Sequence, residues 1–230
     1  MGTIVLVRHG QASFGQANYD QLSPLGFEQA RITGAHLKAR FGPIDAVALG
    51  TMRRHRETAD TCLEAMGISP PRVEHAGFNE YSFENIVRVH TPAFSDQAVM
   101  REKLAQSGDP KRAFQQFFES AISRWTGGEH DHEYEESWPQ FHSRCGGALD
   151  ELVQHLGHGK TALVFTSGGF IGVTVQRLLK LSKEQAFGFN WHIANASLTK
   201  LLYGGKGISL QSFNEHGHLE TPGHAHLSFR

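Results

Sequence analysis

The sequence predicts an α/β protein with three layers, in which helices cover both faces of a mainly parallel sheet. Two short segments, 3–7 and 161–166, are apolar without polar alternation, which is typical of strands buried on both faces. Each is followed along the chain by a segment whose apolar or small residues recur at steps of three and four, the period of an α-helix. Strands that alternate with helices in this way favour a three-layer α/β/α sandwich.

The first helix is the best defined of the predicted elements. Ser23 suits an N-cap and Pro24 suits the first helical position. We expect this helix to run to about Phe41, where a Gly-Pro pair follows. Its face toward the sheet would carry Phe27, Ala30, Gly34, Leu37 and Phe41. A second strand at 45–49 and a second helix at 53–66 continue the alternation.

A helical insertion interrupts this alternation at about 84–136. Charged helical runs at 96–106 and 113–125 are separated and followed by Gly, Asp and Pro. We therefore expect a single domain, 1–230, that carries the segment as an inserted helical cap. The regular order resumes at Ser137, which opens a Ser-x-x-Gln capping box with a long amphipathic helix behind it.

The C-terminal part of the chain is expected to complete the sheet. A helix at 170–181 follows the second apolar strand. Two further strands at 197–203 and 208–213 are expected to be neighbours, because the segment between them, 204–207, is a glycine-rich turn.

The composition argues against nucleic acid and membrane as partners. The formal net charge of the 230 residues is −1 and no long basic run occurs, so the chain has no electrostatic footprint for nucleic acid. No apolar stretch approaches the roughly 18 residues that span a bilayer, and the N-terminus does not resemble a signal peptide. We expect a cytoplasmic protein in which Cys62 and Cys145 are reduced core thiols. The sequence indicates no oligomeric state.

Histidine is in excess, and two pairs stand near the C-terminal end of the sequence. The chain has 15 histidines, among them His216, His218, His224 and His226. The spacing of the pairs matches no defined metal motif, and no cysteine or carboxylate set accompanies them. We interpret them as surface histidines and expect neither a metal nor another cofactor.

Polar side chains stand at three predicted strand ends or helix starts. They are Arg8-His9, the basic run 53–56 and Ser167-Gly168-Gly169, with Glu80 as a fourth candidate. The carboxyl edge of such a sheet is where ligands bind. Phosphoryl transfer needs a nucleophile, donors for the equatorial oxygens and an acid for the leaving oxygen. His9 can be the nucleophile, Glu80 the acid, and the arginines and helix-start N–H groups can bind the phosphoryl group.

In these residues the sequence resembles the histidine phosphatase superfamily, which includes the phosphoglycerate mutases. That family opens with a strand ending in Arg-His-Gly, as Arg8-His9-Gly10 does, and its next helix carries Arg-Ala-x-x-Thr-Ala, which 54–59 matches at Arg and at Thr-Ala. The resemblance implies that His9 is phosphorylated and that Arg54, rather than its basic neighbours, binds phosphate. It also implies that Glu80, in Phe-Asn-Glu where the family has Leu-x-Glu, is the acid.

The sequence departs from the family at two places: the position of Ser167, and the early loop, where an Asn common in the family is replaced near Phe14-Gly15 and Asn18 stands further along. Asn195-Ala196-Ser197 resembles the Asn-x-Ser segment that begins a late family strand. The family's His-Gly-Gly, however, is here Ser167-Gly168-Gly169, so a histidine that contacts the phosphoryl group in the family is replaced. By position, Ser167 and Gly168 remain phosphate-binding residues.

Three functions fit these residues. The first is hydrolysis of a small phosphorylated substrate through a phosphohistidine, without a metal. The second is a phosphatase-like domain that binds a phosphorylated ligand with little or no turnover. The third is a serine hydrolase with Ser167 as nucleophile, disfavoured because Phe165 stands where Gly-x-Ser-x-Gly has its first glycine. A mutase is disfavoured because the pocket has lost a ligand. Substrate choice is expected to lie in the cap and in loop 11–22.

Overall fold

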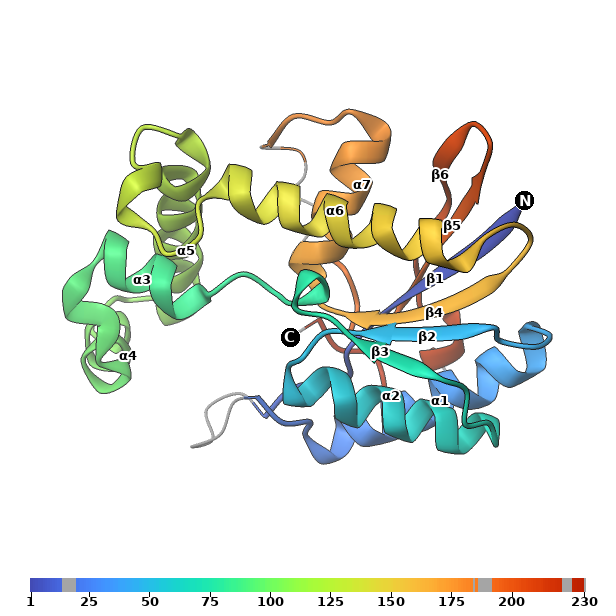
Figure 1. The fold of residues 1–230 in the computed structure, drawn as a ribbon. Helices are drawn as coiled ribbons and strands as arrows, with labels where there is room; N and C mark the ends of the chain where they lie inside the picture. The colour runs from blue at the N-terminus through green and yellow to red at the C-terminus, as the bar shows by residue number, and fades with distance from the viewer. Residues whose placement is uncertain (14–19, 184, 186–191, 221–224, 230) are drawn as a thin grey trace. The chain divides into compact units, whose positions relative to one another are not determined.

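The computed structural model describes residues 1–13, 20–183, 185, 192–220 and 225–229 (Figure 1). The chain forms two compact units. We call Met1–Glu80 with Cys145–Arg230 the sheet unit, and Tyr81–Arg144 the helical unit.

The sheet unit is built on one sheet, with six strands among the described residues in the order β3-β2-β4-β1-β5-β6 (Figure 1). Four strands run parallel: β1 (Gly2–Arg8), β2 (Ala46–Leu49), β3 (Arg72–Glu74) and β4 (Thr161–Thr166). The other two, β5 (Leu198–Gly204) and β6 (Gly207–Glu215), are antiparallel neighbours joined at the predicted glycine-rich turn. β1 and β4 pair in register up to Arg8 and Thr166, so their carboxyl ends are level.

Helices cover both faces of this sheet, which confirms the predicted three-layer fold (Figure 1). One face carries α1 (Pro24–Arg40) and α2 (Arg53–Met66), and the other carries α7 (Gly168–Leu179) and the later part of α6 (Trp138–Leu156). Short 3-10 segments lie at Ala76–Phe78, Pro92–Ser95, Asp131–Glu133 and Gly217–Leu219.

The start of α1 confirms one sequence expectation and corrects another. The Ser23 side chain accepts a hydrogen bond from the Gly26 N–H at 3.1 Å, so Ser23 is the N-cap as predicted. Phe27, expected on the buried face, is exposed. The close contact in this turn is made by Gly26 instead, where a Cβ would come within 2.2 Å of the Gln11 carbonyl oxygen. Phe27 is therefore turned outward.

The core between the sheet and its first two helices is apolar and closed. It includes Val5, Leu37, Leu163 and Phe165, all with no exposed surface, and Cys62 lies among them. Cys145 is also buried, and no disulfide joins the two cysteines, as expected.

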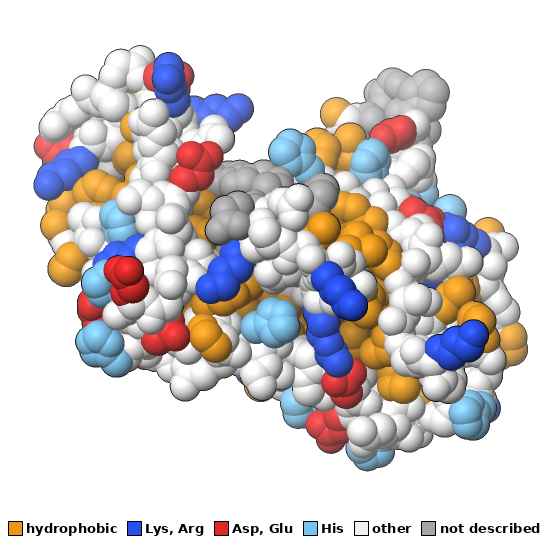
Figure 2. All heavy atoms as spheres, turned by 90° about the horizontal axis from the view of Figure 1, so that it is seen from above, with side chains coloured by type: hydrophobic (Ala, Val, Ile, Leu, Met, Phe, Trp, Pro, Cys, Tyr) orange, Lys and Arg blue, Asp and Glu red, His pale blue; other side chains and the backbone are white. Residues whose placement is uncertain are grey.

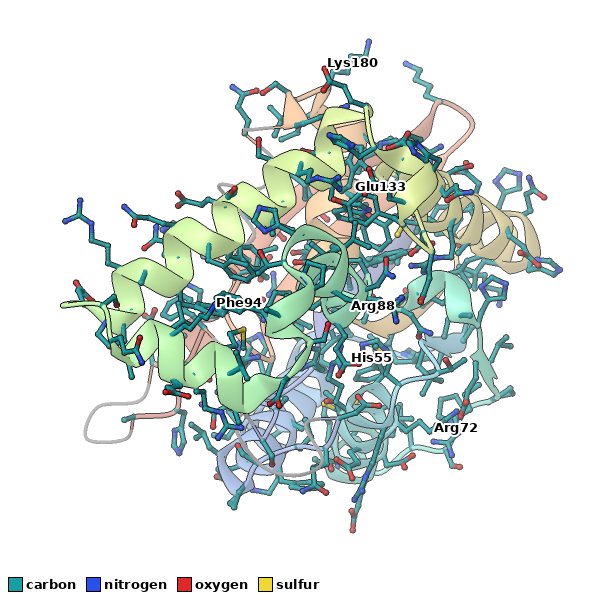
Figure 3. The ribbon with its side chains drawn as sticks, turned by 90° about the vertical axis from the view of Figure 1, so that its left-hand side faces the viewer. His55, Arg72, Arg88, Phe94, Glu133 and Lys180 are labelled. Carbon is teal, nitrogen blue, oxygen red and sulfur yellow. The ribbon has the colours of Figure 1, made fainter. Side chains whose placement is uncertain are left out.

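The helical unit has a core of its own. Besides the first residues of α6 it contains α3 (Phe83–His90), α4 (Gln97–Ala105) and α5 (Pro110–Gly127). Four aromatic side chains pack together there, with ring centroids of five pairs 5.1 to 5.9 Å apart: Tyr81, Trp125, Trp138 and Phe141. The ring centroid of Phe94, a residue labelled in Figure 3, lies 4.9 Å from the ring centroid of Phe117. The helical character predicted for the insertion is present, and its role as a cap stays a prediction.

The capping box at the start of α6 is formed as predicted. The Ser137 N–H donates to the Gln140 side-chain oxygen at 2.8 Å, and the Gln140 N–H donates to Ser137 Oγ at 3.4 Å.

Charge on the drawn face of the molecule is mixed, with basic and acidic side chains interspersed (Figure 2). Among the described residues no helix has both the length and the apolar character required to cross a bilayer.

His218 corrects the expectation of surface histidines near the C-terminal end. Its Nε2 lies 3.0 Å from Thr33 Oγ1, and its ring stacks on His36 with centroids 4.8 Å apart. Burial lowers the pKa of His218 to about 4. His224 lies outside the described residues. Within the part of the chain that is described, no group of three His, Cys, Asp or Glu side chains could hold a metal ion.

Candidate active site

Five buried polar side chains lie at the carboxyl edge of the parallel strands. Arg8 and His9 come from the end of β1, Ser167 follows β4, and Arg54 and His55 lie in the first turn of α2. Buried polar and charged groups are uncommon unless they are paired or functional. Sequence reasoning found all of these positions except His55.

His9 is held as a neutral imidazole with one bare ring nitrogen. Its Nδ1 lies 2.8 Å from the carbonyl oxygen of Gly10. Because a carbonyl only accepts, Nδ1 carries the hydrogen and Nε2 keeps its lone pair. Burial, and after it the positive charges of Arg54 and Arg8, lower the pKa of His9 well below its usual value. The ring therefore presents a nucleophilic nitrogen at neutral pH.

The backbone around His9 is fixed from two sides. Its N–H donates to the Thr166 carbonyl at 2.9 Å, which ties it to β4. Its own carbonyl accepts from the Ala196 N–H at 3.2 Å and from Asn195 Nδ2 at 3.4 Å. The segment 195–197, which the resemblance singled out, thus supports His9 rather than beginning β5.

Gly10 allows the chain to turn against the start of α1. A Cβ at this position would come within 2.4 Å of the Gly26 carbonyl oxygen, so a larger residue would displace the backbone. The Gly10 N–H donates to Thr58 Oγ1 at 3.1 Å, which connects the turn to α2.

The two site arginines are anchored while their basic neighbours point to solvent. The Arg8 guanidinium donates to the Ile193 carbonyl, and Arg54 donates to Asp20 Oδ1 at 2.8 Å. Arg53 and Arg56, by contrast, have half-exposed side chains that pair with Glu57 and Glu74. Of the basic run 53–56, only Arg54 and His55 are buried.

Glu80 lies at the start of α7. Its Oε2 accepts from the Gly169 N–H at 3.0 Å, and a carboxylate is favoured at a helix N-terminus. Its segment is fixed by Thr166 Oγ1, which donates to the Phe78 carbonyl at 2.6 Å. Gly168 is the first residue of α7. Both glycine N–H groups were expected to face a ligand, whereas here the N–H of Gly169 is engaged by Glu80.

His55 is the residue that sequence reasoning missed. Its Nε2 lies 2.7 Å from Ser167 Oγ, and its ring centroid is 5.8 Å from that of His9. In the sequence it reads as one more member of a basic run. The helical period contains the overlooked signal, because His55, Ala59, Cys62 and Met66 form the buried face of α2.

The loop expected to select the substrate is described in part. Residues 14–19 lie outside the described residues. On either side of them, the Ser13 N–H donates to the Gln21 carbonyl at 2.8 Å, and Ala12 pairs with Leu22. The specificity of this loop stays a prediction.

Comparison with known proteins gives a family match. A model of the histidine phosphatase superfamily (branch 1) matches residues 4–112 and 105–216. No curated protein matches the sequence significantly.

Several solved structures share the fold. Phosphoglycerate mutase from Bacillus anthracis str. Sterne has 18% identity and a TM-score of 0.62, with 94% of each chain covered. Phosphoserine phosphatase from Entamoeba histolytica, in complex with 3-phosphoglyceric acid, has 19% identity and a TM-score of 0.64, covering 95% of this chain and 100% of that one. A mycobacterial glucosyl-3-phosphoglycerate phosphatase has 20% identity and a TM-score of 0.60, covering 94% and 100%.

Proposed function

Because the chain belongs to the histidine phosphatase superfamily (branch 1), we propose that it is a phosphomonoester hydrolase that acts through a phosphohistidine at His9. The observation that carries the proposal is the state of His9. Its Nδ1 is engaged by the Gly10 carbonyl, so Nε2 keeps its lone pair, and the positive charges of two buried arginines, Arg8 and Arg54, act on the ring. Such a nitrogen can attack phosphorus while the arginines stabilise the phosphoryl oxygens.

The reaction has two steps. In the first, His9 Nε2 forms a bond to phosphorus while the bond to the leaving oxygen breaks, and Glu80 protonates that oxygen. Arg8 and Arg54 neutralise the equatorial oxygens. In the second, Glu80 takes a proton from water, which attacks phosphorus and releases phosphate from His9.

We propose a small phosphorylated molecule as substrate. The matched phosphoserine phosphatase and the mycobacterial phosphatase are both named for small phosphorylated compounds. The cationic groups described here, Arg8 and Arg54, suit the phosphoryl group that such compounds share.

Trapping of the intermediate tests the proposal. Brief incubation with a 32P-labelled phosphomonoester and quenching in base should leave an acid-labile phosphohistidine on the parent protein and on His155→Ala, an exposed-histidine control. His9→Ala should carry no label and hydrolyse no substrate. Label on His9→Ala would contradict the assignment. Tight binding of a phosphorylated ligand without label or turnover in the parent would favour a binding domain instead.

Chelation tests the proposed independence from metals. The charges assigned to the reaction belong to protein side chains, so hydrolysis of an aryl phosphate should be unchanged in excess chelator. Activity that is lost on chelation and restored by added metal would contradict this part of the proposal.

A further inference from the structure

His55 is a fully buried titratable group that the proposed reaction does not use. It lies in the first turn of α2, with its Nε2 2.7 Å from Ser167 Oγ and its ring 5.8 Å from that of His9. A buried imidazole is costly unless it is hydrogen bonded. Its position beside the nucleophile therefore needs an explanation.

The His55 ring lies against a glycine, Gly50, whose lack of a side chain leaves room for it. A Cβ on Gly50 would come within 2.2 Å of His55 Nδ1, so the ring lies directly against the Gly50 backbone. Within the described part of the chain, His55 Nδ1 has no hydrogen-bond partner. The side chain can thus occupy this place only because residue 50 has no side chain.

These surroundings determine the hydrogen on the His55 ring. A hydrogen on Nδ1 would find no acceptor among the described residues and leave a buried donor unsatisfied, whereas a lone pair beside the Gly50 backbone leaves only an unfilled acceptor, which is less rare in folded proteins. Nε2 therefore carries the hydrogen and donates it to Ser167 Oγ. Burial, followed by the charges of Arg54 and Arg56, lowers the pKa of His55 well below its usual value, so the ring stays neutral.

With its oxygen accepting from His55, Ser167 has a hydrogen left to donate. Ser167 stands at the N-cap position of α7 but makes no side-chain capping bond. It is fully buried and follows β4, whose last residue accepts the N–H of His9. The hydroxyl is thus placed at the same strand ends as the nucleophile.

We propose that His55 is a positioning residue that orients the Ser167 hydroxyl to donate a hydrogen bond to the phosphoryl group transferred to His9. The inference rests on the proposed hydrolysis. Ser167 would touch the phosphoryl oxygen, and His55 would act only through Ser167. A hydrogen bond to a charged acceptor that strengthens in the transition state raises kcat/KM.

A double-mutant cycle on an aryl phosphate tests the coupling. Ser167→Ala and His55→Ala should each lower kcat/KM roughly tenfold and weaken inhibition by orthovanadate. The double variant should be no worse than Ser167→Ala alone, because His55 has no further route to the substrate. Two losses that multiply would overturn the proposal.

Two further variants separate positioning from structural support. His55→Gln, whose amide can also donate to Ser167 Oγ, should recover most of the activity, and a loss equal to that of His55→Ala would count against the proposal. Thr174→Val removes a buried hydroxyl of α7 that, among the described residues, donates to its own helix at the Phe170 carbonyl, and should leave kcat/KM unchanged. Thermal unfolding of each variant identifies any loss of fold.

A measurement independent of activity is the tautomer of His55. Nitrogen-15 NMR of the parent should show a hydrogen on Nε2 and a bare Nδ1. The opposite tautomer would make Ser167 the donor to His55 and would overturn the proposal, as would His55-dependent labelling of Ser167 by a fluorophosphonate. If the parent forms no phosphohistidine, the proposed function itself fails. If the label forms but the cycle is additive, only the role of His55 fails.

Discussion

At the amino edge of the sheet, Lys160 precedes β4 and its Nζ lies 2.8 Å from Asp45, whereas at the carboxyl edge His9 lies close to two buried guanidinium groups. The first pair is exposed and mutually favourable: hydrogen bonding raises the pKa of Lys160 and lowers that of Asp45. At the other edge, burial and positive neighbours lower the pKa of His9 and of His55.

The difference shows that the charged groups at the amino edge stabilise each other, whereas those at the carboxyl edge keep two buried histidines neutral beside positive charge. Positive charge at the carboxyl edge disfavours protonated imidazole and favours an incoming anion, and perturbed groups of this kind are concentrated at functional sites. Changes at the carboxyl edge should therefore alter catalysis and pH dependence. Matched changes at the amino edge should alter neither.

Among variants that keep the nucleophile, the largest expected effect is that of Glu80→Gln. The variant should hydrolyse alkyl phosphates roughly 10²- to 10⁴-fold more slowly, since it cannot protonate the leaving oxygen. Activated aryl phosphates, which leave without a proton, should suffer much less in the first step. Asp45→Asn at the amino edge is the matched carboxylate control and should retain parent rates. Equal losses with both substrate classes would argue against an acid role for Glu80.

The next largest effect is expected for Gly10→Ala, on both stability and hydrolysis. The added methyl would meet the Gly26 carbonyl oxygen at 2.4 Å, and overpacking of this kind costs typically 1–3 kcal/mol of the free energy of unfolding. Urea unfolding measures that loss, and hydrolysis should fall with it because the Gly10 carbonyl orients His9. Gly205→Ala, in the turn between β5 and β6 where a Cβ meets open space, should leave both quantities within error. A fully stable and active Gly10→Ala protein would show that the turn is less constrained than the contact indicates.

Part of the loss of stability in acid should come from the carboxyl edge, in addition to the part that comes from His218. His9 and His55 have lowered pKa values in the folded state and a value near 6.5 when unfolded. Below pH 6.5 the unfolded chain therefore binds more protons, and the free energy of unfolding should fall by up to about 1.4 kcal/mol per pH unit for each histidine. Above pH 6.5 both rings are neutral in the folded and the unfolded state, so this loss of stability is absent there.

Urea unfolding of the parent and of His9→Ala at several pH values between 5 and 8 measures this slope. The variant should show a shallower decline on the acid side, because one of the histidines with a lowered pKa is gone. His155→Ala, which removes an exposed histidine, should keep the parent slope. Parallel curves for all three proteins would contradict the assignment of acid sensitivity to His9.

Much of this carboxyl edge could be predicted because its signals are local in sequence. The apolar strands, the cap at Ser23 and the position of His9 at a strand end follow from neighbouring residues. The choice of Arg54 within its basic run came from the resemblance, since composition alone does not separate it from Arg53. The structure adds the reason, which is that the Arg54 side chain is buried whereas that of Arg53 is half exposed.

The rest depends on contacts between residues far apart in the chain. The hydrogen bond of His55 reaches Ser167 across 112 positions, and that of Glu80 reaches Gly169 across 89. Neither leaves a pattern in a single sequence. Phe27 shows the same limit, because its exposure follows from the approach of Gly26 to the Gln11 backbone rather than from helical period.

The smallest expected effect is that of Lys160→Ala at the amino edge. The substitution removes an exposed pair with Asp45, and such pairs contribute little to stability because water and salt screen them. Asp45 would keep its hydrogen bond from the Thr161 N–H at 2.8 Å, so the start of β4 stays held. The midpoint of urea unfolding should therefore fall only slightly at low ionic strength, and the difference should vanish in about 1 M salt, where the Debye length is about 3 Å. Hydrolysis should equal that of the parent at every pH. A clear loss of turnover in this variant would mean that the charges of the two edges are coupled through the sheet, so that the amino edge is not purely structural.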